Sequence, residues 1–184
     1  KVIVYNTLQA YRWDRLEYLK QVHLKAQEEG FKLGFKLVRG AYMEKERERA
    51  QHQNYMSPIC ISKAVTDLQF DDCLKYMLEN IETISVFFGT HNERSTQLVI
   101  NLMSENKIKA TDNRIWFGQL FGMSDHISFN LAKEGFNVAK YLPFGPVRDV
   151  MPYLIRRAEE NTSVAGQTNR ELSLIGLEKK RRRA

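Results

Sequence analysis

The chain has 184 residues, of which 43% are hydrophobic and 27% charged, as in an ordinary globular domain with a core of its own. Its net charge of +6 comes mainly from the basic residues of segment 178–184, because residues 1–177 hold 23 basic and 21 acidic side chains, a net of +2. Such a nearly neutral body disfavours a nucleic-acid-binding domain, which gathers basic residues on a folded face.

Cys60 and Cys73 are the two cysteines of the chain, and their spacing matches neither a disulfide framework nor a metal site. We therefore predict no bound metal and two reduced, partly buried thiols. No apolar run is long enough to cross a bilayer, and no signal or transit peptide is visible.

Short apolar runs alternate with amphipathic stretches along the chain. The first run, Val2–Tyr5, predicts a strand that Asn6-Thr7 ends, and Gly30 stands where a helix should stop. The polar segment 44–57 predicts a helix fragment with a surface loop, and Thr90 or Asn92 is a candidate cap for the helix that follows. In chain order, we expect strands at 2–5, 33–40, 84–88, 114–120 and 138–142. Helices are expected at 10–29, 62–79, 94–105 and 147–161, with a short helix that ends near residue 133.

Two of these helices carry a readable core-facing pattern. Helix 10–29 is expected to bury the face that bears Leu16, Leu19, His23 and Ala26, and helix 62–79 is expected to bury Leu68, Cys73, Met77 and Leu78.

Strands that alternate with helices predict an α/β fold with parallel pairing and right-handed crossovers. Both a doubly wound sheet and a (β/α)8 barrel satisfy this alternation, but no glycine-rich dinucleotide fingerprint follows the first strand, which disfavours the former. Five strand–helix units are too few to close a barrel of eight strands.

The stretch Phe35–Met43 combines an apolar run, two cations and a glycine. It predicts a buried strand that delivers Lys36, Arg39 and Gly40 to a loop at its carboxyl end, where parallel α/β folds bind ligands. Two cations beside a glycine suit an anion or an electron-rich ring. An ordinary core strand with two solvated charges is the other interpretation.

Tyr153, Arg156, Arg157 and Glu160 share one face of the predicted helix 147–161 and its flank. Two adjacent arginines near a tyrosine suit a clamp for a carboxylate, because guanidinium forks match carboxylate oxygens. A solvated face with an Arg157–Glu160 pair explains the same residues.

Further candidates follow the other predicted strands. Gln9 suits the edge of a heterocycle, and Thr90-His91 suits a phosphate or an adenosine, although loop residues of these types are usually only solvated or capping. Three apolar or aromatic residues, Tyr42, Leu120 and Tyr141, are either pocket walls or core.

Six stretches together resemble the proline dehydrogenase family, the FAD-dependent barrel enzymes that oxidise proline, and they occur in the order of that family. Lys-Leu-Val-Arg-Gly-Ala-Tyr at 36–42 and Phe-Gly-Gln-Leu at 117–120 are similar to the eukaryotic, mitochondrial branch. The six stretches are 6–11, 36–42, 89–92, 117–123, 140–143 and 153–161.

The resemblance implies roles for the candidate residues around FAD. Gln9 would contact the flavin ring and Lys36 would lie beside its N5 edge, while Thr90, His91 and Glu160 would also bind the cofactor, the first two near its adenosine half. Bacterial members usually have Arg at the position of Lys36 and Lys at that of Arg39. Which role belongs to which of the two charged residues is therefore open. The residues implied at the FAD phosphates are Arg39, Gly40 and Ala41.

The same resemblance implies a substrate site. Arg156 and Arg157 would hold the proline carboxylate, and the ring would be enclosed by Tyr42, Leu120, Tyr141 and Tyr153. Proline C5 would then give a hydride to flavin N5, yielding 1-pyrroline-5-carboxylate, and an orientation effect of this kind is worth roughly 7–11 kcal/mol. Tyr141 favours proline, since relatives that prefer hydroxyproline tend to have Ser there.

Partners and location are also implied only by the resemblance: quinone as the electron acceptor, and the matrix side of the mitochondrial inner membrane, with peripheral membrane association. Residues 1–177 would be the C-terminal five-eighths of the barrel, its strands 4–8, followed by a basic tail at 178–184. The family's three earlier strands, which carry a Lys and an Asp of the pocket, would be missing, so we expect the 184 residues alone to fold poorly, aggregate or bind FAD weakly.

Three alternatives remain open at this point. One is hydroxyproline dehydrogenase, and another is a non-catalytic fragment that serves as a binding partner. The third is a module that binds an acidic membrane surface or nucleic acid through Lys179–Arg183.

Overall fold

The computed structural model describes residues 4–163 and 165–183, and the side chains of 156–171, 174 and 183 lie outside that description. The chain divides into two compact units, Lys1–Tyr141 and Leu142–Ala184, which are described separately. None of the helices in the described part of the chain is long and apolar enough to cross a bilayer.

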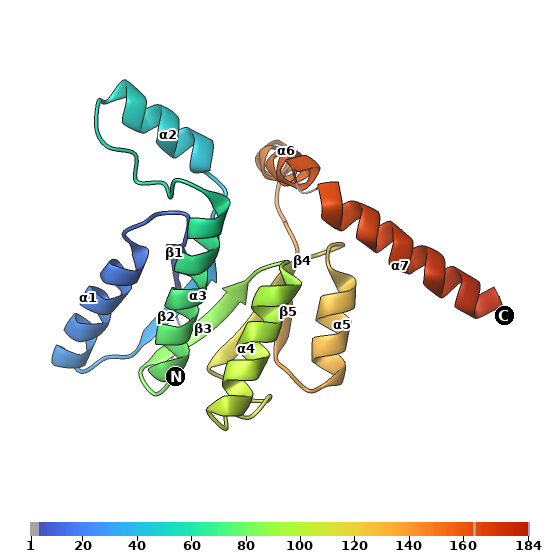
Figure 1. Cartoon of the computed structure of the whole chain (residues 1–184), viewed down its shortest axis with the longest axis horizontal. Helices are drawn as coiled ribbons and strands as arrows, with labels where there is room; N and C mark the ends of the chain where they lie inside the picture. Colours follow the sequence, from blue (N-terminus) through green and yellow to red (C-terminus); the bar gives the residue numbers. More distant parts are fainter. Residues whose placement is uncertain (1–3, 164, 184) are drawn as a thin grey trace. The chain divides into compact units, whose positions relative to one another are not determined.

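Strands and helices alternate through the first unit (Figure 1). Its strands are β1 (Asn6–Gln9), β2 (Leu33–Val38), β3 (Ile84–Gly89), β4 (Ile115–Leu120) and β5 (Val138–Tyr141). Its helices are α1 (Arg15–Glu28), α2 (Met43–His52), α3 (Lys63–Glu79), α4 (Glu93–Glu105) and α5 (Asp125–Lys133). The second unit contains α6 (Val147–Ser163) and α7 (Ala165–Arg183).

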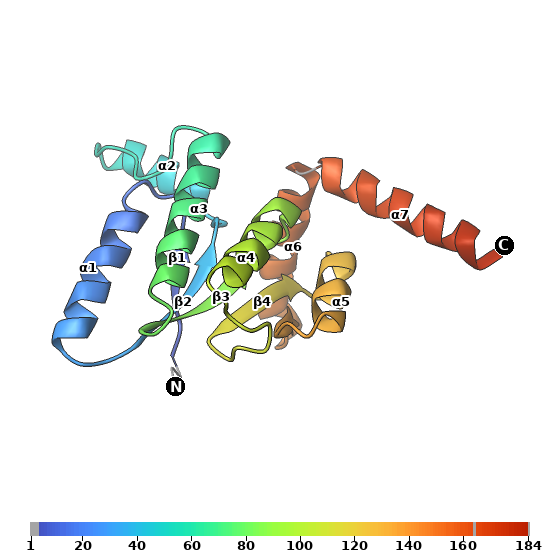
Figure 2. The same ribbon diagram turned by 60° about the horizontal axis from the view of Figure 1, so that its bottom comes forward.

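The five strands form one parallel sheet in the order β1-β2-β3-β4-β5. A doubly wound sheet reverses its strand order at a switch point, whereas consecutive order throughout is the order of a barrel wall. Helices α1, α3, α4 and α5 lie along one face of this sheet (Figure 2). The predicted α/β class and barrel-type architecture are thereby confirmed.

The core lies between the sheet and these helices. Phe35, Phe88 and Phe117 project from neighbouring strands and are fully buried, and Phe70 and Leu74 of α3 pack in the same cluster. The buried face of α1 is as predicted, with Leu19, His23 and Ala26 inside and Leu16 packed at the margin.

Two predictions about local structure are wrong. Leu68 was expected in the core but is 61% exposed. The buried face of α3 carries Phe70, Leu74 and Met77, and Leu68, two residues before Phe70, is rotated from it by about 200° around the helix axis, which places it on the opposite side. Within the described residues, β1 is Asn6–Gln9, whereas the prediction ended the strand at Tyr5 and made Asn6-Thr7 a loop. The reason is that Asn6–Gln9 are the residues that pair with Phe35–Val38 of β2, while positions 2 and 3 of the predicted strand lie outside the described residues. In addition, the basic tail was not predicted to be helical, yet it ends the helix α7.

Several smaller predictions are confirmed. Asn92 caps α4 by accepting a hydrogen bond from the Ser95 backbone N–H at 3.0 Å, and Gly30 follows α1 with a φ of 75°. Cys60 and Cys73 are free thiols and both are buried, and burial raises the pKa of Cys73 to about 12.

Candidate functional site

The carboxyl ends of the strands carry most of the predicted site residues of the first unit. Gln9, Leu120 and Tyr141 are the last residues of β1, β4 and β5, and Thr90 follows the last residue of β3. Because parallel strands present these ends at one edge of the sheet, residues far apart in sequence meet there.

Lys36 of β2 and Tyr141 of β5 lie on the same face of the sheet. This inner face is opposite to the face along which α1, α3, α4 and α5 lie. The Lys36 Nζ is 5.6 Å from the centre of the Tyr141 ring and 5.8 Å from that of Phe87 on β3. In a flat sheet, strands three places apart are about 14 Å from each other, so the two side chains reach inward across β3 and β4. A cation beside aromatic rings on an inner face is the setting expected for an electron-rich planar ligand.

Two strand glycines make room on this inner face. A Cβ on Gly118 would lie 2.0 Å from the Phe87 ring, and a Cβ on Gly89 would lie 2.8 Å from Val38 and 3.3 Å from the Lys36 stem. Both glycines therefore allow side chains of the neighbouring strand to lie flat against the sheet. Neither glycine was predicted to shape this face, although a glycine in an apolar strand is a signal of close approach.

Arg39 links β2 to α3 and α4 through hydrogen bonds with Asp67, Thr90 and Ser95, and these four residues form the Arg39 bracket. Its Nε donates to Asp67 Oδ1 at 2.7 Å, one terminal nitrogen donates to Thr90 Oγ1 at 3.3 Å, and the other donates to Ser95 Oγ at 2.9 Å. The guanidinium also lies over the Phe70 ring at 4.4 Å. Arg39 and Thr90, predicted separately, are thus brought together.

Asp67 and Ser95, two partners of Arg39, were not predicted from the sequence. Burial would raise the pKa of the Asp67 carboxyl group, but hydrogen bonds from Lys63 and Arg39 outweigh burial and lower it. The carboxylate stays ionised and fixes the guanidinium of Arg39. A signal existed in the spacing of Lys63 and Asp67, which is that of an ion pair on a helix.

Gln9 and Gly40 meet at Tyr11. The buried Tyr11 hydroxyl donates to Gln9 Oε1, and a Cβ on Gly40 would lie 1.7 Å from the Tyr11 ring. Gly40 also has a φ of 119°, so a side chain is excluded there on two grounds. Burial raises the pKa of Tyr11, which therefore remains a hydrogen-bond donor at neutral pH.

A second polar cluster joins the ends of β3 and β4. His91 Nδ1 is 2.9 Å from Ser124 Oγ, and the Leu120 backbone N–H points to His91 Nε2 at 3.5 Å. The buried Gln119 amide donates to the Thr90 carbonyl at 3.3 Å and accepts from the Ser128 hydroxyl at 2.9 Å. Gln119, Ser124 and Ser128 were missed, although a glutamine inside an apolar strand was a visible signal.

The remaining predicted residues are less constrained. Tyr42 precedes α2 and is 38% exposed, with Lys45 Nζ 5.8 Å from its ring centre, and Ala41 lies in the same loop. In the second unit, Tyr153 is half-buried on α6. The side chains of Arg156, Arg157 and Glu160 lie outside the described residues, so the arginine clamp stays a prediction.

The opposite edge of the sheet is hollowed as well. An open hollow of about 700 Å³ lies among residues such as Glu82, Lys107, Asp112 and Arg114, before β3 and β4 begin. None of the predicted site residues lines it, and in barrels this edge serves stability. We therefore place the functional site at the carboxyl edge, where the predicted residues converge.

The described residues contain no group of three His, Cys, Asp or Glu side chains arranged to hold a metal ion. The donor set of the carboxyl edge consists instead of cations, hydroxyl groups, amides and aromatic rings, which suits an organic ligand with anionic groups.

A family model described as proline dehydrogenase matches residues 1–170. "Proline dehydrogenase 1, mitochondrial" of Caenorhabditis elegans is 41% identical over 97% of the chain, and the protein of the same name from Homo sapiens is 40% identical over 99% of it. The chain spans only 30% and 31% of the lengths of these relatives.

Among solved structures, proline utilization A from Bdellovibrio bacteriovorus inactivated by N-propargylglycine is similar to this chain with a TM-score of 0.80 and 32% identity. The match covers 86% of the chain and 16% of that protein.

Proposed function

Because the chain belongs to the proline dehydrogenase family, we propose that it forms part of an FAD-dependent enzyme that oxidises L-proline to 1-pyrroline-5-carboxylate. The observation that carries this proposal is the meeting of Lys36 with Tyr141 on the inner face of the sheet, at positions that the family resemblance names independently. The family match over residues 1–170 supports the same reaction.

The described residues fit an FAD. Among them, the Arg39 guanidinium makes three hydrogen bonds, which leaves two of its five N–H donors for a phosphate. We propose that Gly40 and Ala41, in the loop after β2, line the FAD phosphates together with Arg39. Thr90 and His91 would lie near the adenosine half, and Glu160 is proposed as a further cofactor-binding residue. Gln9 and Lys36 would face the ring system.

When bound, FAD supplies the hydride acceptor for proline C5. Arg156 and Arg157 bind the substrate carboxylate, and this fixes the orientation of the ring. On the family resemblance, Tyr42, Leu120, Tyr141 and Tyr153 would surround the ring and exclude water. Lys36 contributes a positive charge where negative charge gathers during the reaction.

We extend the proposal to the setting of the enzyme. The relatives' names support a mitochondrial location. The family resemblance further implies quinone as the electron acceptor. It also implies peripheral attachment to the matrix side of the inner membrane. The division of the chain into a barrel part, 1–177, and a basic tail, 178–184, is proposed on the same ground.

The test is flavin reduction in the protein that carries these residues. We expect bound flavin with its visible absorbance, bleached by L-proline under anaerobic conditions. Hydroxyproline should bleach it far less, because the family resemblance associates Tyr at position 141 with a preference for proline. Flavin that ignores proline would reject the substrate, faster bleaching by hydroxyproline would favour the alternative enzyme, and absence of flavin would reject the cofactor.

The Lys36→Met variant tests the residue that carries the proposal. We expect proline to reduce its flavin about a hundredfold more slowly, since a fixed charge at the reacting centre is lost. Lys20→Met is the matched control, because Lys20 is exposed on α1 and should leave the rate unchanged. Equal rates for the two variants would contradict a role for Lys36.

A further inference from the structure

The turn between β4 and α5 has an unusual backbone. Gly122 and Ser124 both have positive φ angles, 76° and 51°, and Ser124 is one of the few non-glycine residues of the described chain in this region. Ser124 also occupies the position before α5 where a serine normally caps the helix, but its side chain makes no cap bond. Its hydroxyl group pairs with His91 Nδ1 instead, at 2.9 Å.

Lys140 holds the other side of this turn. Its Nζ is 2.6 Å from the Met123 carbonyl oxygen, 3.4 Å from the Leu120 carbonyl oxygen and 2.7 Å from Asp125 Oδ1. An ammonium group has three N–H donors, so these three acceptors match its capacity. The side chain is only 23% exposed, which strengthens each of these contacts.

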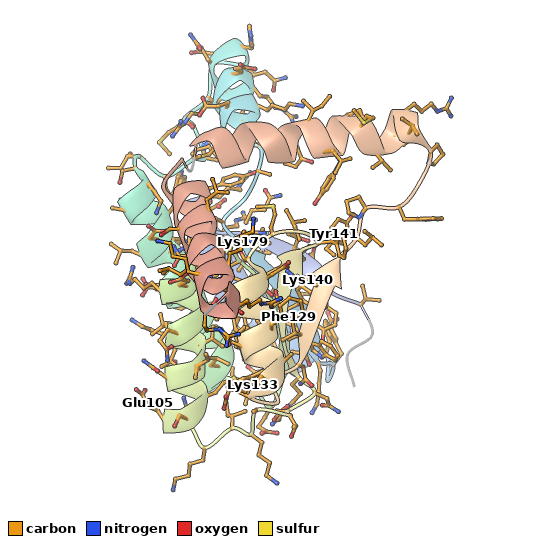
Figure 3. All side chains as sticks on the ribbon, turned by 90° about the vertical axis from the view of Figure 1, so that its right-hand side faces the viewer. Glu105, Phe129, Lys133, Lys140, Tyr141 and Lys179 are labelled. Atoms are coloured by element: carbon orange, nitrogen blue, oxygen red, sulfur yellow. The ribbon has the colours of Figure 1, made fainter. Side chains whose placement is uncertain are left out.

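Lys140 and Tyr141 follow one another on β5 (Figure 3) and therefore point to opposite faces of the strand. Tyr141 faces Lys36 on the inner side, while Lys140 reaches the turn before α5. The backbone ties Tyr141 to Leu120, since Leu120 pairs with Tyr141 in the sheet and the Phe121 N–H donates to the Tyr141 carbonyl at 2.9 Å.

We propose that Lys140 is a positioning residue for the substrate pocket: its ammonium group fixes the β4–α5 turn and thereby holds Leu120 beside Tyr141. The inference rests on the proposed function, in which these two side chains wall the proline ring. Lys140 itself does not touch the substrate. It acts by satisfying two carbonyl groups of a turn whose backbone conformation is otherwise unfavourable.

The test compares Lys140→Met with Lys133→Met. Methionine keeps the length of the side chain but loses the donors, and Lys133 is an exposed lysine at the far end of α5 (Figure 3). In Lys140→Met we expect hydrogen exchange of the amides of residues 120–125 to accelerate about tenfold. In the flavin-loaded protein, we expect the KM for proline to rise several-fold with little change in kcat. Lys133→Met should match the wild type in both.

Two further variants keep the test informative if Lys140→Met folds poorly. Lys140→Arg retains the charge and should restore most of the exchange protection and of the proline KM. Asp125→Asn removes one charged acceptor and should give a smaller change in the same direction. Unchanged exchange in Lys140→Met, or faster exchange with an unchanged KM, would overturn the proposal.

Failure of the proposed function is distinguishable from failure of this inference. A wild-type protein that binds flavin and ignores proline would reject the proposed function together with the substrate role of Lys140. A wild-type protein that oxidises proline, with a Lys140→Met variant that oxidises it identically, would reject only the role of Lys140.

Discussion

Buried polar residues in the first unit are held by specific partners. His23 is 2% exposed, and its two ring nitrogens lie 2.8 Å from the Tyr76 hydroxyl and 2.7 Å from Thr83 Oγ1. Because Thr83 donates its own proton to the Asn80 carbonyl, His23 Nε2 carries the proton toward Thr83 and Nδ1 accepts from Tyr76. Among the described residues, Asp71 Oδ1 is buried without a hydrogen-bond partner, while its Oδ2 accepts from Arg94 at 2.9 Å.

The buried neutral state of His23 predicts a pH dependence of stability. Burial lowers the pKa of His23 below its ordinary 6.5, so just below that pH the unfolded chain binds more protons at this residue than the folded chain does. The stabilising contribution is complete above pH 6.5 and is lost as pH falls below it, by at most about 1.4 kcal/mol per pH unit. Urea unfolding between pH 5 and 8 measures this loss.

The control for His23 is a difference between variants, because carboxyl groups also titrate toward pH 5. The free energy of unfolding of His23→Gln should depend less on pH than that of the wild type. His52→Gln changes an exposed residue at the end of α2 and should keep the wild-type pH dependence. Parallel curves for wild type and His23→Gln would show that His23 is not the group responsible.

The Arg39 bracket predicts a second effect at a single residue. Arg39→Met removes the hydrogen bonds to Asp67, Thr90 and Ser95 and should lower the free energy of unfolding by about 2 kcal/mol. Lys63→Met removes only the exposed partner of Asp67 and should cost less than about 1 kcal/mol. Equal losses in urea titrations would show that the bracket contributes no more than a surface ion pair.

At the level of elements, close approach between strands decides the inner face. Phe87 of β3 lies flat over Gly118 of β4, and Lys36 of β2 lies over Gly89 of β3. These contacts shape the surface on which Lys36 and Tyr141 meet. The helices contribute on the other face, where α3 packs against α1 and α4 and on strands β2 and β3.

Glycine-to-alanine substitutions separate these strand contacts from general effects. Gly118→Ala would place its Cβ 2.0 Å from Phe87 and should destabilise the chain by about 1–3 kcal/mol. Gly176→Ala, in α7 with nothing within 4 Å of the added Cβ, should be neutral or stabilising by about 1 kcal/mol. Thermal unfolding measures both, and a harmless Gly118→Ala would show that Phe87 can move aside.

At the level of the whole molecule, the first unit is an open parallel sheet. Among the described residues of this unit, β1 and β5 each pair with one neighbouring strand, so both present an edge of backbone donors and acceptors. Consecutive strand order with helices along one face is the arrangement found in the wall of a barrel.

The open edges predict that the 184-residue chain associates with itself. Light scattering should show a molecular mass that rises with concentration, because edge strands pair between copies. Val4→Lys places a charge beside the β1 edge, where Val4 is 79% exposed, and should reduce association, whereas Gln97→Lys adds the same charge on exposed α4 and should not. A monomer at all concentrations would contradict this prediction.

Much of the architecture was predictable from the sequence, because it depends on local patterns. The buried face of α1 and the Asn92 cap follow from residue spacing within one element, and the parallel α/β class follows from the alternation of strands and helices along the chain. The family resemblance added the identities of the site residues, which single motifs did not establish. The predicted end of the first strand at Tyr5 and the predicted burial of Leu68 were wrong because they depend on what a neighbouring strand or helix covers.

Only the tertiary structure decided which of these residues touch. Lys36 and Tyr141 lie 105 positions apart in the sequence, and Arg39 and Asp67 lie 28 apart. Lys140 contacts Leu120, Met123 and Asp125 of the β4–α5 turn, which lie 20, 17 and 15 positions before it. No periodicity within an element encodes such distances, because they arise when parallel strands align their carboxyl ends and the sheet brings them to one edge. The sequence by itself therefore determined the elements and the family, and the packing of the sheet determined the site.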